Sequence, residues 1–430
     1  MTETETQQGR EIILGPKVDL HDGVHGALVT DPPADVRYSV RQAKHLFQFS
    51  DRGVKSPHEH FHFGECVDFG SGSELVHSAR WPVINRGAWV TDMDDFGYPV
   101  LVGRALVNPD VRSRLRGDVD ARIGMRRRGR NMLAMYAHPS CKAVIFRTQQ
   151  GIDLAGHHLA NLQVGALAET FLQKALVLYP AQRTSSREKV DRKWAGDTPL
   201  RVVFCGRDYE TKNGLLALRI FRRLAATMPD VSFTYIGEVP PECDPRVLGP
   251  GIEILGTLQR REVLDAFERG HILFHPSKFE SVGIVLLEAA AAGMAIVAAT
   301  GGEMSHMSEL FDADRAVLLN RDTVAPGDEE KWFYDELRQL VSSPLAAASM
   351  ARRNYMVSVA GKFSLTHRNA TLSAIYESAI ANPAEPATVS QLWDAGDGAI
   401  GTLESRAVLG DQVEYLHKIG ITKQHVNVLG

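Results

Sequence analysis

Two glutamates that lie eight positions apart frame the segment of the sequence best suited to chemistry. Glu280 follows a predicted strand at 272–277, and Glu288 lies two turns into an apolar helix predicted over 282–292. Gly283 lets the backbone come close to a ligand. The free N–H groups of the first helical turn can bind phosphate oxygens, and the two carboxylates can accept hydrogen bonds from sugar hydroxyls.

The same two carboxylates also have a structural interpretation. A carboxylate in so apolar a helix is costly unless it has partners. Glu288 could therefore pair with a buried Arg or Lys, while Glu280 is solvated. The motif taken alone does not distinguish the ligand-binding interpretation from the structural one.

A second pair of charged residues, Arg207 and Lys212, lies in the loop after the predicted strand RVVFCG, which begins at Arg201. In a doubly wound sheet this loop lies at the carboxyl end of the strands, where ligands bind. Two cations beside a helix N-terminus suit a diphosphate. The alternative is a basic surface turn, which is the commoner meaning of such a pair taken alone.

Short apolar strands alternate with helices from Leu200 to about 320, which predicts a doubly wound α/β domain. Upstream, EIIL, HFHFG, GAWVTD, KAVIF and KALVLY are plausible strands of a second α/β domain. We expect an N-terminal domain over 1–185, a polar linker over 186–198 and a C-terminal domain over 199–365. A helix and tail follow over 366–430, with the helix packing back on the N-terminal domain.

The composition of the chain favours no particular class of binding partner. The 430 residues suit two domains, and a net charge of -4 gives no general attraction to nucleic acid. Four scattered cysteines and a polar start, MTETETQQGRE, predict a cytoplasmic protein without a secretory signal. The apolar window 283–302 is interpreted as a buried helix and strand, because Glu288 lies inside it.

The stretch from about Val202 to Leu319 resembles the donor-binding domain of the retaining GT-B glycosyltransferases of family 4. The matching features are Arg207 and Lys212 in an Arg-x4-Lys loop, the Glu-x7-Glu motif from Glu280 to Glu288, the sequence AAAAG at 289–293, and Gly301 with Gly302. The resemblance implies a GT-B-like fold, with two Rossmann-type domains facing each other across a cleft.

The resemblance also assigns roles. It implies that Glu280 contacts the transferred sugar, that Glu288 contacts the nucleotide ribose, and that Arg207 and Lys212 hold the diphosphate. The predicted donor site comprises Gly206, Arg207, Lys212, Ser281, Val282, Gly283, Glu288 and Gly302. The family usually has a Gly and an aromatic residue after the first Glu, whereas this chain has Ser281 and Val282. This difference bears on which sugar the donor carries.

Family members also carry a catalytic-site His in the N-terminal domain, at the end of a strand. Here Met93 occupies that place in VTDMDDF, so the correspondence fails. We name His62 as the candidate, with His60 as an alternative. Further candidates are Asp92, Asp94 and Asp95.

Two weaker patterns remain. Asp92-Met93-Asp94 could hold a divalent cation, as could Asp118-Val119-Asp120 and Asp312-Ala313-Asp314, but such pairs occur by chance in a chain of this length. We expect no obligatory metal and no cofactor. The Arg-rich stretch 112–130 could contact an anionic membrane surface at the inner face, although a solvated helix face is the commoner meaning.

The sequence therefore predicts a retaining hexosyltransferase. It would use a nucleotide-sugar donor, with UDP preferred to GDP, and a sugar, lipid-linked or small-molecule acceptor, without nucleic acid. We expect the acceptor to attack on the face from which the diphosphate leaves, with that phosphate helping to deprotonate it. Two alternatives stay open: a nucleotide-sugar epimerase or hydrolase of the same fold, and a non-catalytic nucleotide-sugar-binding partner subunit.

Overall fold

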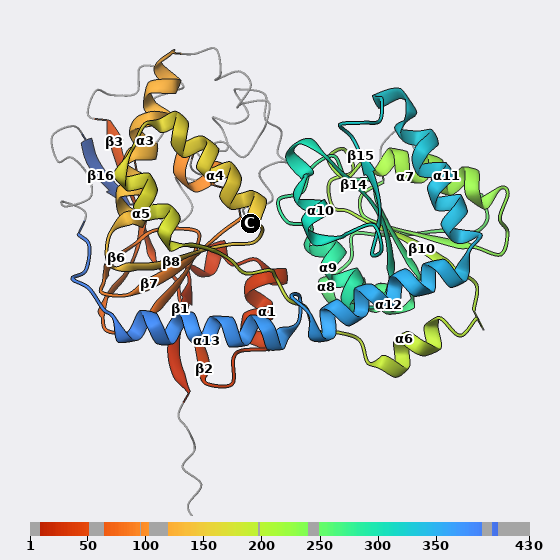
Figure 1. Cartoon of the computed structure of the whole chain (residues 1–430), viewed down its shortest axis with the longest axis horizontal. Helices are drawn as coiled ribbons and strands as arrows, with labels where there is room; N and C mark the ends of the chain where they lie inside the picture. Colours follow the sequence, from red (N-terminus) through yellow and green to blue (C-terminus); the bar gives the residue numbers. More distant parts are fainter. Residues whose placement is uncertain are drawn as a thin grey trace, which may run out of the picture. The chain divides into compact units, whose positions relative to one another are not determined.

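A computed structural model gives the fold of the chain. It describes residues 9–50, 64–94, 96–102, 119–196, 198–239, 249–388 and 398–402. The chain divides into two compact units, one made of residues 1–178 with 369–430 and the other of residues 179–368. They are called the N-terminal and the C-terminal unit below, and Figure 1 shows their elements.

The C-terminal unit is built on a six-stranded parallel sheet with the order β12-β11-β10-β13-β14-β15. Its strands are β10 (Arg201–Cys205), β11 (Ser232–Ile236), β12 (Ile252–Gly256), β13 (Ile272–His275), β14 (Ala295–Thr300) and β15 (Val317–Asn320). Numbered from β10, this order is 3-2-1-4-5-6, that of a Rossmann fold. The strand order reverses between β10 and β13, so a ligand site is expected there.

Helices cover both faces of this sheet (Figure 1). They are α6 (Arg187–Lys193), α7 (Gly214–Ala225), α8 (Arg260–Arg269), α9 (Ile284–Ala291), α10 (His306–Leu310), α11 (Glu329–Val341) and α12 (Pro344–Ala360). β14 is buried along its whole length, and α9 is buried from Leu286 to its end. Strands buried on both faces become continuous apolar runs, which explains why the window 283–302 is so apolar.

The N-terminal unit has a second six-stranded parallel sheet, with the order β2-β1-β5-β7-β8-β9. Its strands are β1 (Arg10–Gly15), β2 (Val36–Val40), β5 (Val76–Ala79), β7 (Trp89–Met93), β8 (Cys141–Phe146) and β9 (Ala175–Val177). Its order reverses between β1 and β5. The prediction of an α/β fold with two Rossmann-type domains is confirmed.

Alternate residues of this sheet enter two different cores. Val144 and Phe146 pack with α3 (Val119–Ala137), α4 (Gln149–Leu162) and α5 (Ala166–Lys174), whereas Ala143 and Ile145 pack with α1 (Ala27–Thr30) and α13 (Leu365–Ala381). Figure 1 shows these two groups of helices on opposite faces. The period of two along each strand produces this division.

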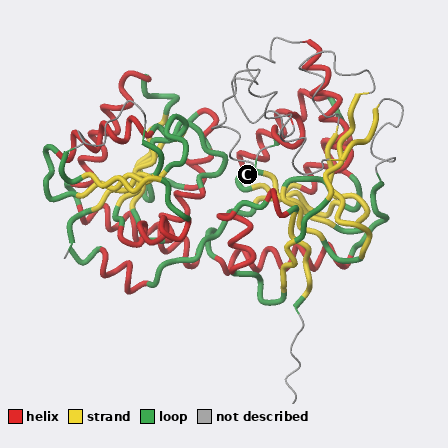
Figure 2. The backbone as a smooth tube through the Cα atoms, turned by 180° about the vertical axis from the view of Figure 1, so that it is seen from behind, coloured by secondary structure: helices red, strands yellow, loops and turns green. Residues whose placement is uncertain are grey.

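A smaller sheet accompanies the N-terminal unit. It has the order β16-β3-β4-β6, with β3 (Lys44–Ser50) antiparallel to both β4 (Gly64–Gly72) and β16 (Gly398–Thr402), and β6 (Val83–Arg86) parallel to β4. Figure 2 shows the strands of both sheets of this unit. This sheet was not predicted from the sequence, because it joins segments about 350 residues apart whose pairing leaves no local signal.

The expected boundaries differ from the observed division. The predicted linker 186–198 contains helix α6, in which Val190 and Lys193 are buried, and the units divide between Leu178 and Tyr179. The polar composition misled the prediction, because the Lys193 ammonium group is buried against the carbonyl oxygens of Phe267 and Ala292, at 3.2 and 2.7 Å. From Asn369 onward, α13 belongs to the N-terminal unit.

No helix within the described part of the chain is both long enough and apolar enough to cross a membrane.

Candidate functional site

The loops after β10 and β13 lie side by side at the point where the strand order of the C-terminal sheet reverses. The amide of Lys278 donates to the carbonyl oxygen of Thr211 at 2.7 Å, which joins the two loops. Segments with no common sequence motif thereby bring Lys212 and Glu280 together. This is the position at which doubly wound sheets bind ligands.

One carboxylate oxygen of Glu280 receives two donors. Lys212 Nζ and His275 Nε2 each lie 2.6 Å from Oε1. Burial opposes ionisation of this group, but the positive charge of Lys212 and the hydrogen bonds from Lys212 and His275 outweigh it and lower the pKa of Glu280 to about 2. Glu280 is therefore an anion held in place, with only 11% of its side chain exposed, and it is not the solvated glutamate of the structural alternative.

His275 was not among the predicted site residues. It ends β13, and its ring is buried with only 1% of the side chain exposed. Because the Glu280 carboxylate is ionised, it can only accept, so His275 must carry its proton on Nε2. A histidine that ends a strand five residues before a motif glutamate is the signal that could have indicated it.

The environment of Glu288 agrees with part of the structural alternative. Arg260 donates from Nε to Oε1 at 2.9 Å, and its Nη2 forms an ion pair with the same oxygen at 2.8 Å. Nη2 donates its hydrogen bond to Gln182 at 2.8 Å. Burial raises the pKa of Glu288, and Arg260 opposes the rise. Glu288 is thus paired with an arginine, but Arg260 contacts only Oε1.

Arg207 and Lys212 differ in their surroundings. Arg207 is exposed and forms no ion pair with any residue that the structure describes. Lys212 is only 23% exposed and also donates to the carbonyl oxygen of Phe279 at 3.2 Å. Gly206 makes room for this lysine, because a Cβ added there would lie 2.7 Å from the Cβ of Lys212. The loop is folded around its lysine, whereas Arg207 is available to a ligand.

The start of α9 depends on a glycine. Gly283 is the N-cap residue, with φ of 78°, and an added Cβ would lie 2.7 Å from Met307 Cε. Ser281 is exposed and the side chain of Val282 is buried. Their backbone N–H groups are the predicted phosphate donors. Gly302, also predicted to belong to the donor site, donates its amide to Asp322 Oδ2 at 3.1 Å.

The candidates of the N-terminal unit have separate environments. Asp92 is buried and accepts hydrogen bonds from His25 and His77, while Asp94 is 28% exposed and forms an ion pair with Arg80 at 3.3 Å. Because histidine N–H groups engage both oxygens of Asp92, this pair does not fit a divalent-cation site. His60, His62, Asp95 and Asp118 lie outside the described residues, and so do most side chains of 112–130.

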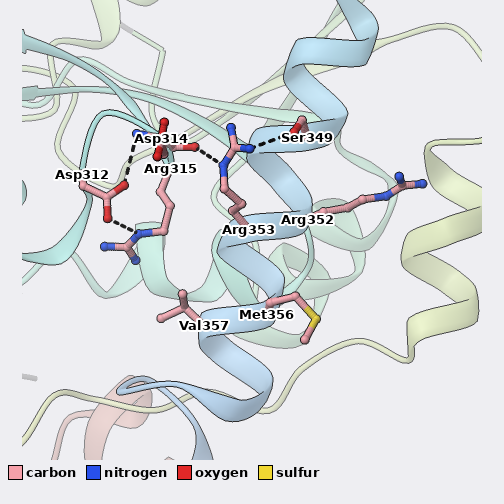
Figure 3. Close-up of a pocket in the computed structure, with 8 residues that line it drawn as sticks. All are labelled: Asp312, Asp314, Arg315, Ser349, Arg352, Arg353, Met356 and Val357. Atoms are coloured by element: carbon pink, nitrogen blue, oxygen red, sulfur yellow. Dashed lines mark hydrogen bonds and ion pairs between the residues drawn. The ribbon is translucent and has the colours of Figure 1, made fainter.

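In the described ranges, no three His, Cys, Asp or Glu side chains are placed to hold a metal ion. A cavity of about 470 Å³ lies between α12 and the segment 312–315. Figure 3 shows that Asp312, from a predicted carboxylate pair, forms an ion pair with Arg315, and that Arg353 donates to the carbonyl oxygen of Asp314. None of the predicted donor-site residues lines this cavity.

The C-terminal unit is similar in sequence to known proteins. Residues 199–343 match the family model described as Glycosyl transferases group 1. The Schizosaccharomyces pombe phosphatidylinositol N-acetylglucosaminyltransferase gpi3 subunit is 27% identical over 186 residues, 39% of this chain and 41% of that protein. The Arabidopsis thaliana sulfoquinovosyl transferase SQD2 is 32% identical over 117 residues, 26% of this chain and 22% of that protein.

Two solved structures are also similar to this chain, each at low sequence identity. Anabaena Alr3699/HepE, in complex with UDP and glucose, has a TM-score of 0.49 and 14% identity, covering 86% of this chain and 100% of that one. WaaG, a glycosyltransferase involved in lipopolysaccharide biosynthesis, has a TM-score of 0.49 and 12% identity, covering 85% and 99%.

The similarity to group 1 glycosyltransferases lies in residues 199–343, which make up most of the C-terminal unit. The chain spans less than half the length of the curated relatives it matches.

Proposed function

We propose that this protein is a retaining glycosyltransferase that moves a hexose-type sugar from a nucleotide diphosphate donor, with UDP preferred, to a hydroxyl acceptor. The observation that carries the proposal is the Glu280 carboxylate, whose Oε1 is held by Lys212 and His275. Its Oε2 has no hydrogen-bond partner among the described residues, so it is suited to a sugar hydroxyl.

Each neighbouring group has a role in this proposal. Arg207, Lys212 and the first turn of α9 hold the diphosphate and stabilise its charge as it leaves. Glu288 accepts hydrogen bonds from the ribose through the oxygen that Arg260 does not contact. These assignments follow the family roles given above, and the position of the loops after β10 and β13 supports them.

In the proposed step, the bond from the anomeric carbon to the phosphate oxygen breaks, and a bond from the acceptor oxygen forms on the same face. The acceptor proton passes to an oxygen of the leaving diphosphate, so charge and atoms balance. In this step the Lys212 ammonium group exchanges its ion pair with Glu280 for one with the diphosphate. A trapped covalent glycosyl-enzyme adduct would contradict same-face attack.

The names of the relatives supply the first probes. One acts on phosphatidylinositol as an N-acetylglucosaminyltransferase, according to its name. UDP-N-acetylglucosamine and UDP-glucose are therefore suitable donors, with phosphatidylinositol in vesicles as the first acceptor. This choice tests one of the three acceptor classes that the sequence leaves open, the lipid-linked one, together with the membrane-surface contact considered for the stretch 112–130.

The decisive experiment is a thermal-shift panel of UDP, GDP, ADP and their common sugars on the parent protein and on Glu288→Ala. A ligand that binds only the folded state raises its apparent stability. We expect a shift with the uridine compounds that the variant loses. No shift with any nucleotide would refute the proposed donor site.

A turnover assay then separates the alternatives. Release of UDP that requires an acceptor supports a transferase, whereas consumption of donor without an acceptor indicates a hydrolase or epimerase. Binding without turnover would favour the partner subunit, a role compatible with the word "subunit" in the name of one relative.

A further inference from the structure

A chain of buried hydrogen bonds runs from α13 into the N-terminal sheet. The Tyr376 hydroxyl lies 2.8 Å from the Tyr38 hydroxyl and 2.6 Å from His77 Nδ1. His77 Nε2 in turn lies 3.0 Å from Asp92 Oδ1. His77 and Asp92 are each at most 3% exposed, so water does not replace these contacts.

The chain continues to the turn that follows β1, residues 21–26. Asp92 Oδ2 lies 2.5 Å from His25 Nε2, and the backbone amide of His21 donates to His25 Nδ1 at 2.8 Å. The exposed ring of His21 folds over the same turn, because its Nδ1 accepts from the amide of Gly23 at 3.0 Å. Five consecutive hydrogen bonds thus connect the Tyr38 hydroxyl to a surface turn.

The direction of each bond follows from its partners. The backbone amide of His21 can only donate, so His25 Nδ1 carries no proton and its Nε2 donates to Asp92. Arg147 beside Asp92 helps to hold the pKa of that carboxyl well below its usual range, although burial opposes this. The carboxylate therefore only accepts, and His77 also donates from Nε2.

The remaining bond follows from the donor role of Nε2. An imidazole that carries its hydrogen on Nε2 presents Nδ1 as an acceptor, so the Tyr376 hydroxyl donates to His77 Nδ1 at 2.6 Å. Arg147 lies 2.6 Å from the same carboxylate of Asp92 and supplies its counter-charge. Tyr376 therefore supplies the donor that holds the outer nitrogen of the His77 ring.

The position of these hydrogen bonds in the N-terminal sheet indicates their role. His77 lies on β5, and the turn 21–26 follows β1. The order of the N-terminal sheet reverses between these two strands, which is where doubly wound sheets bind ligands.

We propose that Tyr376 is a positioning residue for the turn 21–26, acting through His77, Asp92 and His25, and that this turn contacts the acceptor. The second half of this statement rests on the function proposed above. The first half concerns only the N-terminal unit.

The test compares Tyr376→Phe with Tyr38→Phe in hydrogen exchange measured by mass spectrometry. Tyr376→Phe keeps the ring but leaves His77 Nδ1 without its donor. We expect exchange in the peptide that covers residues 21–26 to accelerate about tenfold, the effect of losing one hydrogen bond. Tyr38→Phe, the matched control, keeps the bond from Tyr376 to His77 and should leave exchange unchanged. Equal exchange in both variants and the parent would overturn the proposal.

A second measurement does not depend on the Tyr376→Phe variant. Nitrogen-15 NMR of the histidine-labelled parent protein, with resonances assigned from single His→Gln variants, should show a hydrogen on Nε2 and none on Nδ1 for both His25 and His77. A proton on Nδ1 of either ring would overturn the directions derived above, even if Tyr376→Phe failed to fold.

Turnover tests the contact with the acceptor. With UDP-N-acetylglucosamine and phosphatidylinositol vesicles, we expect kcat of Tyr376→Phe to fall about tenfold with an unchanged KM for the nucleotide sugar. Accelerated exchange with normal turnover would overturn the contact between the turn 21–26 and the acceptor, although Tyr376 would still position that turn. If the parent protein does not convert either substrate, the proposed function fails. Hydrogen exchange and NMR still decide whether the hydrogen bonds from Tyr376 position the turn 21–26.

Discussion

His275 donates its Nε2 hydrogen to Oε1 of Glu280 at 2.6 Å, from the last residue of a fully buried strand. Its other ring nitrogen, Nδ1, is buried without a hydrogen-bond partner in the described part of the chain. The ring therefore contributes one bond, and that bond orients the proposed catalytic carboxylate.

The first prediction concerns this histidine. His275→Gln should lower kcat roughly 10- to 100-fold, the effect of losing one hydrogen bond to a charged group, while UDP binding changes little. Steady-state kinetics and UDP titration provide the measurement. His271→Gln is the control, because the His271 ring bonds only to the backbone of Lys193 and Arg201 and its loss should affect stability alone. Similar kcat values for both variants would contradict the role of His275.

The second prediction is the pH dependence of stability at Glu280. The pKa of this group falls from its ordinary value of 4.5 to about 2 on folding. A lowered pKa of an acid contributes stability above the unfolded value, and that stability is lost as the pH falls from 4.5 towards 2.

We therefore expect Glu280→Gln to be less stable than the parent by on the order of 1–3 kcal/mol at neutral pH. The difference should shrink in the acid range. Urea unfolding at pH 7 and pH 3.5 measures it, and a difference that grows on acidification would show that the sign is wrong.

The third prediction concerns Arg260. Burial already raises the pKa of Glu288, and removing the arginine raises it further, so the ionised form that accepts ribose hydroxyls becomes less populated at low pH. Arg260→Met should weaken UDP binding about tenfold at pH 6 and less at pH 8. Calorimetric titration at both pH values provides the test. The control is Arg261→Met at the exposed neighbouring residue. An equal loss of UDP affinity at both pH values would contradict a cause in the pKa of Glu288.

The fourth prediction contrasts two glycines. Gly283→Ala places a Cβ at φ of 78° and 2.7 Å from Met307 Cε. It should destabilise the protein by about 1–3 kcal/mol and abolish nucleotide binding. Gly156→Ala, in α4, meets nothing within 4 Å and should stabilise by about 0.5–1 kcal/mol. Thermal unfolding distinguishes the two signs. A Gly283→Ala variant as stable as the parent would show that the turn is not constrained.

The C-terminal sheet could be predicted because its signals are local. Each element has a local signal within about a dozen residues: short apolar runs for the strands, the helical spacing of apolar residues from Leu215 onward for α7, and a glycine before α9. The polar stretch 186–198 failed as a linker because polarity there does not mean exposure. Lys193 is buried against helix-terminal carbonyl oxygens, and burial lowers its pKa to about 7.

By itself, the sequence determined the order of the elements and the motif carboxylates, Glu280 and Glu288. Only the tertiary structure decided their partners: Lys212 reaches Glu280 across 68 positions, and Arg260 reaches Glu288 across 28. The hydrogen bonds from Tyr376 through His77 to Asp92 could not be predicted from the sequence either, because Tyr376 and His77 lie 299 positions apart. The physical reason is that strand order decides which loops adjoin, and burial then requires each charge among them to find a partner.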